Sequence, residues 1–475
     1  MKKALALATL TAVSLVAPSY AATDGEVQQL KQMIEEMRRE LQQVKEENRQ
    51  LKREIEQLKG AKGAPVAAKG FKSKSGKQVD FYGYFKIDAA YSDSAAVGED
   101  YIVWALPESG NSNDDGFNLN FKHSRFGFLI KTQEGGYDIV GNMEFDFYGD
   151  LTGKNDPNKI GIRVRKAWVQ FGKNDWNIRA GMDWMLLTQL YPHLSNFPSG
   201  ALMGNIGYRI PQVRFTKYFK FDNSKLTTQV AVDKTWGEPY PFAPFIDTGF
   251  DSGRPDVQGR VAYDFSVGGV KLHLGAIGHY GKVQVDLAKA IKKRNSTVYL
   301  TYGDKYLDTY SYGLELGISP TDWLSLTGKV WAGRNLAGWY TGGVGQGVLY
   351  LVKKADGTYA VATSYPSLAA GDTLIDAKEI DAKGGWVELT LKPSPKWVFH
   401  TGYGVDNPDD DDFKYGSYVY TKARTKNTMY YANGFYKMTP SLGFMMEYLR
   451  VKTDYDFLDA DGTVNRFQGS VLYFF

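Results

Sequence analysis

Arginines recur near the middle of successive strand-like runs in the first half of the chain. Arg125, Arg163, Arg165, Arg179 and Arg214 lie in neighbouring runs. In a narrow aqueous passage, a guanidinium attracts carboxylates and phosphates and can hold them with two parallel hydrogen bonds. If these runs cross a membrane as β-strands, an arginine facing lipid at mid-depth would cost about 2–4 kcal/mol. We therefore expect all five to face an aqueous interior or a subunit interface.

Other charged residues extend this set of candidate pore residues. Arg209 and Arg214 are an odd number of residues apart, so they would point to opposite faces of one strand. We therefore expect Arg209 to belong to the end of the preceding loop, where the chain returns to the wall. Nearby acids could pair with the arginines and stiffen the wall, and such pairing is compatible with an anion-attracting passage. Acids that face bases across a passage also create a transverse field that orients dipolar solutes. The remaining candidates are Glu144, Asp146, Asp183, Lys86 and Asp88.

The residue types argue against other chemistry. The chain has no cysteine and therefore no disulfide or thiolate. No serine motif accompanies a histidine, so a barrel-embedded hydrolase is disfavoured and we expect no enzymatic activity. The excess of positive charge lies in residues 1–22 and 60–77. The remainder of the chain is nearly neutral, and nothing in it suggests that it binds nucleic acid. We expect no cofactor and no metal, because no ligand spacing for zinc connects the five histidines, His123, His193, His273, His279 and His400.

From Val79 onward, the sequence predicts an all-β transmembrane fold. The chain beyond the leader has no apolar run of about 18 residues that could form a membrane helix. Instead, runs of about 10–13 residues are separated alternately by short turns and long loops, which predicts a 16-stranded antiparallel β-barrel with both termini in the periplasm. Short turns are expected at 133–136, 173–175, 221–224, 266–269, 319–322, 393–395 and 439–441. Long loops are expected at 94–116, 150–160, 188–207, 236–255, 282–306, 336–383, 407–426 and 456–464.

Several of these runs alternate between apolar and polar residues. In 256–265, Val257 and Val261 oppose Gln258 and Arg260. A closed barrel suits such strands, because it satisfies every backbone polar group within lipid. Around 117–130 and 161–172 the parity slips, and we expect bulges or protein-packed faces there.

The N-terminal part of the chain predicts export and oligomerisation. Residues 1–22 have the charged, apolar and small-residue regions of a secretory signal peptide. Over 24–59, an unbroken heptad repeat with basic e and acidic g positions predicts a parallel coiled coil of identical chains rather than a single amphipathic helix. Asn48 fixes register and by itself favours dimers, whereas the mixed a and d residues leave the number of helices open. The a and d residues are Val27, Leu30, Ile34, Met37, Leu41, Val44, Asn48, Leu51, Ile55 and Leu58.

Two segments connect or fill the predicted barrel of residues 78–475. Residues 60–77 are rich in Gly, Ala, Ser and Lys and predict a flexible basic linker. Its lysines could contact peptidoglycan or anionic headgroups, or simply be solvated. The connection 184–207 is apolar and contains prolines, unlike an exposed surface loop. We expect it to fold into the barrel as a constriction, with a latch between protomers as the alternative.

The last strand, Phe467–Phe475, is apolar or small on one face and polar on the other. It is expected to close the barrel against 79–91, with its outer face towards lipid or a neighbouring protomer. The barrel as a whole is expected to contact outer-membrane lipid and lipopolysaccharide. Tyr473 and Phe475 form a terminal aromatic pattern similar to the signal that bacterial outer-membrane barrels present to the barrel-assembly machinery.

The chain resembles the DcaP-like family of trimeric outer-membrane porins and, more distantly, the phosphate-selective porins of the O/P type. The first half carries the specific motifs, and the second half matches by architecture. The resemblance implies a bacterial outer-membrane location, a homotrimer, a 16-stranded barrel behind a periplasmic coiled coil, and passage of small dicarboxylates. The motifs that match the family's second to sixth strands are Ser124–Phe128, Glu144–Phe147, Arg163–Val169, Ala180–Asp183 and Arg209–Phe215.

We therefore expect an outer-membrane porin that gives passive diffusion to small, preferentially anionic solutes through an arginine-lined constriction. Within this class, a phosphate-selective or general porin is the alternative. A structural tether between outer membrane and cell wall is the alternative of another class, but a smaller barrel would suffice for it.

Overall fold

The computed structural model describes residues 71–73, 76–108, 114–150, 160–235, 252–294, 297–363, 372–458 and 460–475. The predicted signal peptide, the coiled coil and most of the linker lie outside the described residues. At the end of the predicted linker, β1 (Phe71–Lys72) pairs with the start of the first wall strand. Within the described ranges, no helix has the length and apolarity needed to cross a membrane.

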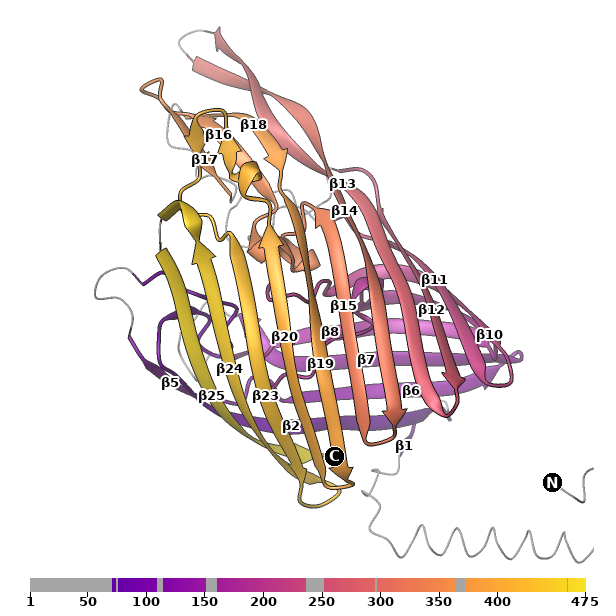
Figure 1. Cartoon of the computed structure of the whole chain (residues 1–475). Helices are drawn as coiled ribbons and strands as arrows, with labels where there is room; N and C mark the ends of the chain where they lie inside the picture. The colour runs from indigo at the N-terminus through magenta and orange to yellow at the C-terminus, as the bar shows by residue number, and fades with distance from the viewer. Residues whose placement is uncertain are drawn as a thin grey trace, which may run out of the picture. The chain divides into compact units, whose positions relative to one another are not determined.

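Sixteen antiparallel strands close into one β-barrel, as the sequence predicted (Figure 1). The sheet contains 18 strand segments, because β1 is an added edge and β5 and β6 are two parts of one wall strand. Each wall strand is bonded on both sides, so the backbone has no open edge towards lipid. The wall strands are β2 (Gln78–Ser92), β5 (Gly116–Asn120) with β6 (Arg125–Glu134), β7 (Tyr137–Asp150), β8 (Ile160–Lys173), β9 (Trp176–Trp184), β10 (Arg209–Lys220), β11 (Ser224–Asp233), β12 (Asp256–Val267), β13 (Val270–Arg294), β14 (Thr297–Thr321), β15 (Leu324–Arg334), β19 (Asp381–Ser394), β20 (Trp397–Pro408), β23 (Lys426–Lys437), β24 (Leu442–Tyr455) and β25 (Ala460–Phe474).

The barrel closes where the last strand meets the first. β25 pairs antiparallel with β2, in the region expected from the sequence. The Phe475 N–H donates to the Gly83 carbonyl at 3.1 Å, and the Phe475 ring packs against Phe81 with centroids 5.1 Å apart. The terminal aromatic thus packs at the seam of the barrel.

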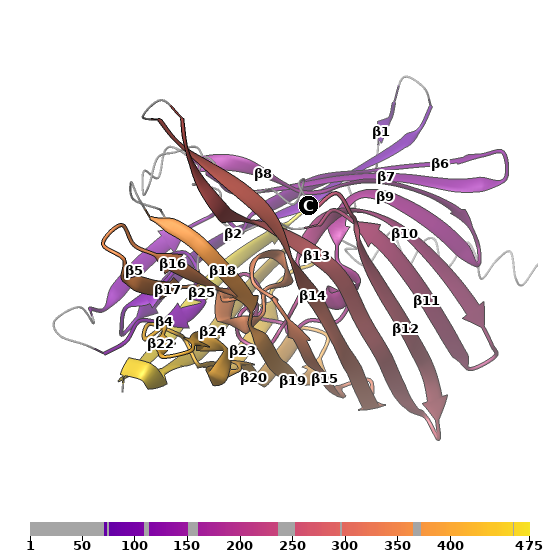
Figure 2. The same ribbon diagram turned by 90° about the horizontal axis from the view of Figure 1, so that it is seen from above.

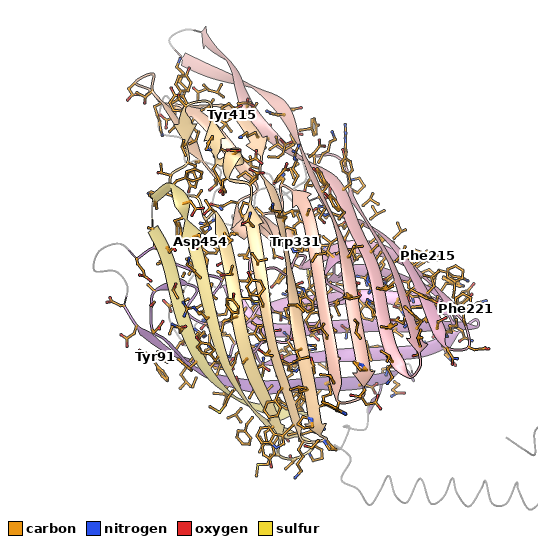
Figure 3. All side chains as sticks on the ribbon, viewed as in Figure 1. Tyr91, Phe215, Phe221, Trp331, Tyr415 and Asp454 are labelled. Carbon is orange, nitrogen blue, oxygen red and sulfur yellow. The ribbon has the colours of Figure 1, made fainter. Side chains whose placement is uncertain are left out.

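Side chains alternate between an exposed apolar outer face and a buried polar inner face. On β12, Val261 exposes 49% of its surface outside, whereas Gln258 exposes 1% inside. Phe215 and Phe221 likewise project outward from the wall (Figure 3). This pattern fits a wall with lipid on one side and polar groups on the other.

The two predicted slips in parity correspond to two real irregularities. The second wall strand is interrupted between β5 and β6, where the Ser124 hydroxyl accepts from the Lys86 N–H at 2.9 Å and donates to the Lys86 carbonyl at 3.1 Å. The Ser124 side chain thereby replaces the backbone hydrogen-bond partners that Lys86 of β2 lacks at the interruption. Between β7 and β8 the register shifts twice, at Glu144/Phe145 and Asp146/Gly149.

The long connections contain more structure than the sequence predicted. The loop prediction at 282–306 is wrong, because β13 and β14 continue through most of it as an extended hairpin. Beside this hairpin lies a small sheet of β16 (Val348–Lys353), β17 (Tyr359–Ala362) and β18 (Thr373–Glu379), inside the predicted loop 336–383 (Figures 1 and 2). Val285 and Leu307 of the hairpin pack against Tyr350 and Leu374 of this sheet. The apolar–polar alternation continues in this part of β13, where Val283 and Val285 are buried and alternate with Lys282 and Gln284. Val285 packs on the small sheet rather than on lipid.

The remaining short elements also lie in the long connections. They are β3 (Ala96–Val97), β4 (Trp104–Ala105), β21 (Lys414–Tyr415), β22 (Tyr418–Val419) and the 3₁₀ turns Leu186–Thr188, Gly338–Tyr340, Gly343–Gly345, Asp410–Phe413 and Asp456–Leu458.

Candidate functional site

The connection between β9 and β10, residues 185–208, runs through the barrel interior and is called the inward segment below. Its polar anchor is Glu447 of β24. One carboxylate oxygen accepts from the N–H of Ser195 at 2.6 Å, and the other accepts from the N–H of Asn196 at 2.8 Å. The segment therefore reaches strands that lie well away along the wall from those that flank it.

Apolar contacts fix the ends of the same segment. Met185 and Ile206 pack with Ile277 of β13 and Trp331 of β15. The Trp331 indole N–H also donates to the Gly204 carbonyl at 2.7 Å. The sequence suggested an interior position for this connection because it is apolar. Its contacts with the inner wall account for these apolar residues.

Arginines and acids of β7 and β8 form a tight ion-pair network. Arg163 donates to both carboxylate oxygens of Asp146, at 3.0 and 2.7 Å. Arg165 bridges Glu144 at 2.8 Å and Asp146 at 2.9 Å. The side chains of Arg165 and Asp146 are fully buried, whereas that of Arg163 is 28% exposed. Both predicted readings, a stiffening network and a charged lumen surface, are compatible with this geometry.

Two further arginines adjoin this network. Arg125 approaches His123, with 2.9 Å between Nη2 and Nε2, and lies over the Tyr84 ring. Arg209 donates to the hydroxyl of Tyr208, and its guanidinium lies 5.2 Å from the centroid of the Trp184 ring. We refer to Arg125, Arg163, Arg165 and Arg209 with Glu144 and Asp146 as the arginine cluster.

The arginine cluster carries an excess of positive charge. Its four guanidiniums and two carboxylates leave a net charge of +2. Arg209 is 3% exposed, and among the described residues its Nε and Nη1 have no hydrogen-bond partner. Since an uncompensated buried charge is costly, its retention here favours a functional role.

An aromatic side chain of the inward segment covers the cluster. The Phe197 ring stacks on Tyr148 with centroids 5.0 Å apart. The guanidiniums of Arg163 and Arg165 lie 5.4 and 5.9 Å from the Phe197 centroid. The sequence did not indicate this contact, because only the fold brings the segment against β8.

Open space adjoins the other side of the cluster. A cavity of about 590 Å³ lies between the N-terminal and C-terminal wall strands. Arg125 and Glu144 therefore border a space that is large enough for small solutes. Its lining includes Tyr82, Tyr84, Arg125, Glu144, Phe435 and Phe474.

Two other predicted pore arginines, Arg179 and Arg214, lie on β9 and β10 and share one acid. Arg179 pairs with Asp183 and lies over the Trp168 ring, and Arg214 Nη2 is 3.6 Å from Asp183. These contacts form a second group on β9 and β10, in which two guanidiniums share one carboxylate and leave a net charge of +1.

Lys86 and Asp88 pair at 3.1 Å and are both 2% exposed. Lys86 also donates to the Ser195 carbonyl at 3.0 Å, and Asp88 accepts from Ser470 at 2.6 Å. The structure thus places both residues at an anchor of the inward segment. Lys86 also lies 3.1 Å from His123 Nδ1, so His123 connects this anchor to Arg125 of the arginine cluster.

Acids predominate on the inner face of other wall strands. Glu315 of β14, Glu388 of β19 and Glu447 of β24 face the interior and are 1–5% exposed. The arginine cluster belongs to β6, β7, β8 and the start of β10. Bases on one part of the wall and acids on another would give a field across the lumen, and this expectation from the sequence stays a prediction.

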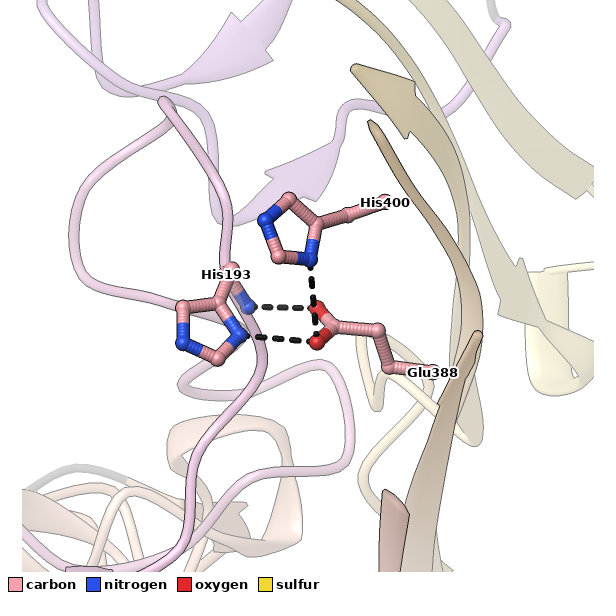
Figure 4. A group of neighbouring side chains, drawn as sticks. All are labelled: His193, Glu388 and His400. Carbon is pink, nitrogen blue, oxygen red and sulfur yellow. Dashed lines mark hydrogen bonds and ion pairs between the residues drawn. The ribbon is translucent and has the colours of Figure 1, made fainter. Parts of the chain in front are cut away.

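The fold also assembles a group that the sequence did not suggest. His193 of the inward segment, Glu388 of β19 and His400 of β20 place one potential ligand atom each within 4.8 Å of one another (Figure 4). Spacing along the chain gave no zinc pattern, since a tertiary contact of the inward segment brings His193 to the other two residues.

A closed barrel of 16 strands with a polar interior and an inward-folded connection defines a porin-type channel. The chain is an outer-membrane channel of this class. The family model described as DcaP outer membrane protein matches residues 11–235. The crystal structure of the outer membrane channel DcaP of Acinetobacter baumannii is similar with a TM-score of 0.61 and 18% identity, covering 86% of this chain and 99% of that chain. The predicted resemblance to the DcaP family is confirmed.

Other solved porins are less similar. The anion-selective porin from Comamonas acidovorans has a TM-score of 0.48 and 11% identity, covering 84% of this chain and 100% of that chain. The OmpF complex of Salmonella typhi with daunomycin has a TM-score of 0.48 and 12% identity, covering 85% and 99%. No curated protein sequence matches the chain.

Proposed function

We propose that the channel gives passive diffusion to small, preferentially anionic solutes, with the inward segment and the arginine cluster forming its constriction. The observation that carries this proposal is the net charge of +2 where Phe197 faces Arg163 and Arg165. In a narrow lumen, fixed positive charge raises the local concentration of anions and lowers that of cations.

A pair of solutes with equal carbon chains tests the charge preference. Proteoliposomes that contain the channel are diluted into isotonic succinate or isotonic 1,4-diaminobutane, and the swelling rates are compared. Faster swelling in succinate is expected. Faster swelling in the diamine would refute the proposal, and liposomes without protein correct for leakage.

Small dicarboxylates are the proposed natural substrate class, because the family resemblance implies them. Carboxylates suit guanidiniums, but phosphates do so as well. Succinate and inorganic phosphate are therefore titrated separately against the chloride current of single channels. If succinate reduces the chloride current at lower concentrations than phosphate does, the dicarboxylate proposal is supported. If phosphate reduces the current at lower concentrations than succinate, a phosphate-selective channel is favoured. If both reduce it equally and only weakly, a general porin is favoured.

The proposal extends to assembly and partners. The leader would direct export, the terminal aromatic strand would engage the barrel-assembly machinery, and the coiled coil would support a homotrimer in the periplasm. The heptad pattern of 24–59 supports an oligomer of identical chains, and the number of three comes from the family resemblance. A pure tether between outer membrane and cell wall is less favoured, because a tether does not need a charged constriction. The porin-type fold favours transport rather than catalysis.

A further inference from the structure

We infer that His193, Glu388 and His400 form a binding site for a divalent transition-metal ion, with Zn²⁺ the best fit, and that the bound ion fastens the inward segment to the barrel wall. The site combines one residue of the inward segment with one residue from each of two adjacent strands, β19 and β20. It shares no residue with the arginine cluster, and metal binding there does not depend on the anion preference proposed above.

The distances between the three side chains are close to those of a tetrahedral zinc site. Ligands about 2.0–2.1 Å from zinc lie about 3.3 Å from one another. His400 Nδ1 is already 3.3 Å from Glu388 Oε1, and His193 Nδ1 is 2.7 Å from the same oxygen. The two imidazole rings lie beside each other with centroids 4.6 Å apart. Small rotations of the two imidazoles would therefore suffice to enclose an ion.

The glutamate is held in an orientation that suits a metal ligand. Its Oε2 accepts hydrogen bonds from the Tyr431 hydroxyl at 2.6 Å and from the His193 backbone N–H at 2.7 Å. Its Oε1 faces the two Nδ1 atoms, and Thr390 donates to it at 3.1 Å. Outer hydrogen bonds of this kind fix ligand carboxylates and strengthen metal binding.

Burial differs among the three residues in a way that leaves the ion an entry path. The Glu388 side chain is fully buried and that of His400 is 10% exposed, whereas that of His193 is 57% exposed. An ion could therefore arrive from the lumen on the His193 side. Two imidazoles and one carboxylate also leave a fourth position for water, as in open zinc sites.

The donor set selects the class of ion. Two imidazole nitrogens and one carboxylate suit Zn²⁺, Cu²⁺ or Ni²⁺. Calcium prefers six to eight oxygen ligands, and magnesium prefers octahedral oxygen coordination, so neither fits this set. The site therefore distinguishes transition metals from the divalent ions that bridge lipopolysaccharide.

Binding would change the channel in two ways. The ion would tie His193 to β19 and β20, in addition to the Glu447 anchor of the inward segment. It would also add positive charge to the interior. Zinc should consequently quieten fluctuations of the open current and increase the preference for anions.

Metal binding is tested on the full chain, purified without a histidine tag and washed with a chelator. Calorimetric titration with Zn²⁺ should show one saturable site per chain, and Co²⁺ should give visible absorption bands of a four- or five-coordinate site. His400→Gln and Glu388→Gln should each weaken Zn²⁺ binding by about tenfold or more. Tyr431→Phe retains all three ligands and should weaken binding by about tenfold through the loss of carboxylate support.

The matched control is His279→Gln. His279 also faces the interior and is 5% exposed, but it bonds to Ser311 and Thr309 of β14 instead of an acid. This variant should bind Zn²⁺ like the wild type. Resistance of each variant to heat and detergent checks folding, and zinc should raise the unfolding temperature of the wild type but not of His400→Gln. Absence of saturable Zn²⁺ binding by the wild type, or equal binding by His400→Gln, would overturn the inference.

Discussion

Replacing Arg209 by glutamine removes one charge of the arginine cluster that no carboxylate neutralises. Arg209 donates to Tyr208 and lies over Trp184, and glutamine can still donate a hydrogen bond. Among the described residues Arg209 forms no ion pair, unlike Arg163 and Arg165, so its loss leaves the network with Glu144 and Asp146 intact. Arg209→Gln therefore tests the charge of the constriction with little direct disturbance of the wall.

The expected size of this effect follows from electrostatics. An anion about 5 Å from the guanidinium is stabilised by about 0.8 kcal/mol in a medium as polar as water. Salt at about 0.1 M, with a Debye length of about 10 Å, reduces this to about 0.5 kcal/mol. A cation is destabilised equally, so removing the charge lowers the preference for anions by about 1 kcal/mol, or about fivefold in the permeability ratio.

The assay is the reversal potential of reconstituted channels in a KCl gradient. Arg209→Gln should lower the chloride-to-potassium permeability ratio by about fivefold relative to the wild type. Arg450→Gln is the matched control, because Arg450 is exposed on the outer face of β24 and the change in charge is the same. An unchanged ratio in Arg209→Gln, or an equal change in Arg450→Gln, would refute the assignment of the constriction.

Three further predictions concern the network, the anchor and the coiled coil. Asp146→Asn removes the carboxylate that Arg163 and Arg165 share, so it should increase the anion preference while lowering stability by about 3–5 kcal/mol, measured by denaturant unfolding in detergent; unchanged stability would contradict the buried network. Glu447→Gln weakens the anchor of the inward segment and should increase the noise of single-channel currents, whereas a quiet channel would show that other contacts suffice. Deletion of residues 24–60 should leave single-channel conductance intact but make the oligomer less resistant to heat on native gels, and loss of conductance would argue that this segment takes part in the pore.

The strands and turns were predictable because the membrane imposes a simple pattern on them. Val257, Val261 and their polar neighbours alternate as a lipid–water wall requires, and Gly, Pro, Asn and Asp mark the short turns. The extended hairpin of β13 and β14 was missed because its outer part packs on β16–β18 rather than on lipid. Val283 and Val285 alternate with Lys282 and Gln284 there, but one sequence does not show that these apolar residues face a second sheet.

The site was predictable in its residue types but not in its arrangement. Arg163 and Arg165 are two residues apart in one predicted strand, so their common face could be inferred despite the irregular alternation around them. The position of Phe197 against both arginines depends on how the inward segment folds, as does the meeting of His193 with Glu388. Such contacts join residues that are far apart in the chain, and they follow from packing rather than from local pattern.

The reversal potential of the wild-type channel in a salt gradient tests most directly whether the arginine cluster governs permeation. With KCl higher on one side, a potential of the sign set by chloride is expected, and it should move towards zero as salt screens the fixed charge. A potential of the sign set by potassium would contradict an anion-preferring constriction.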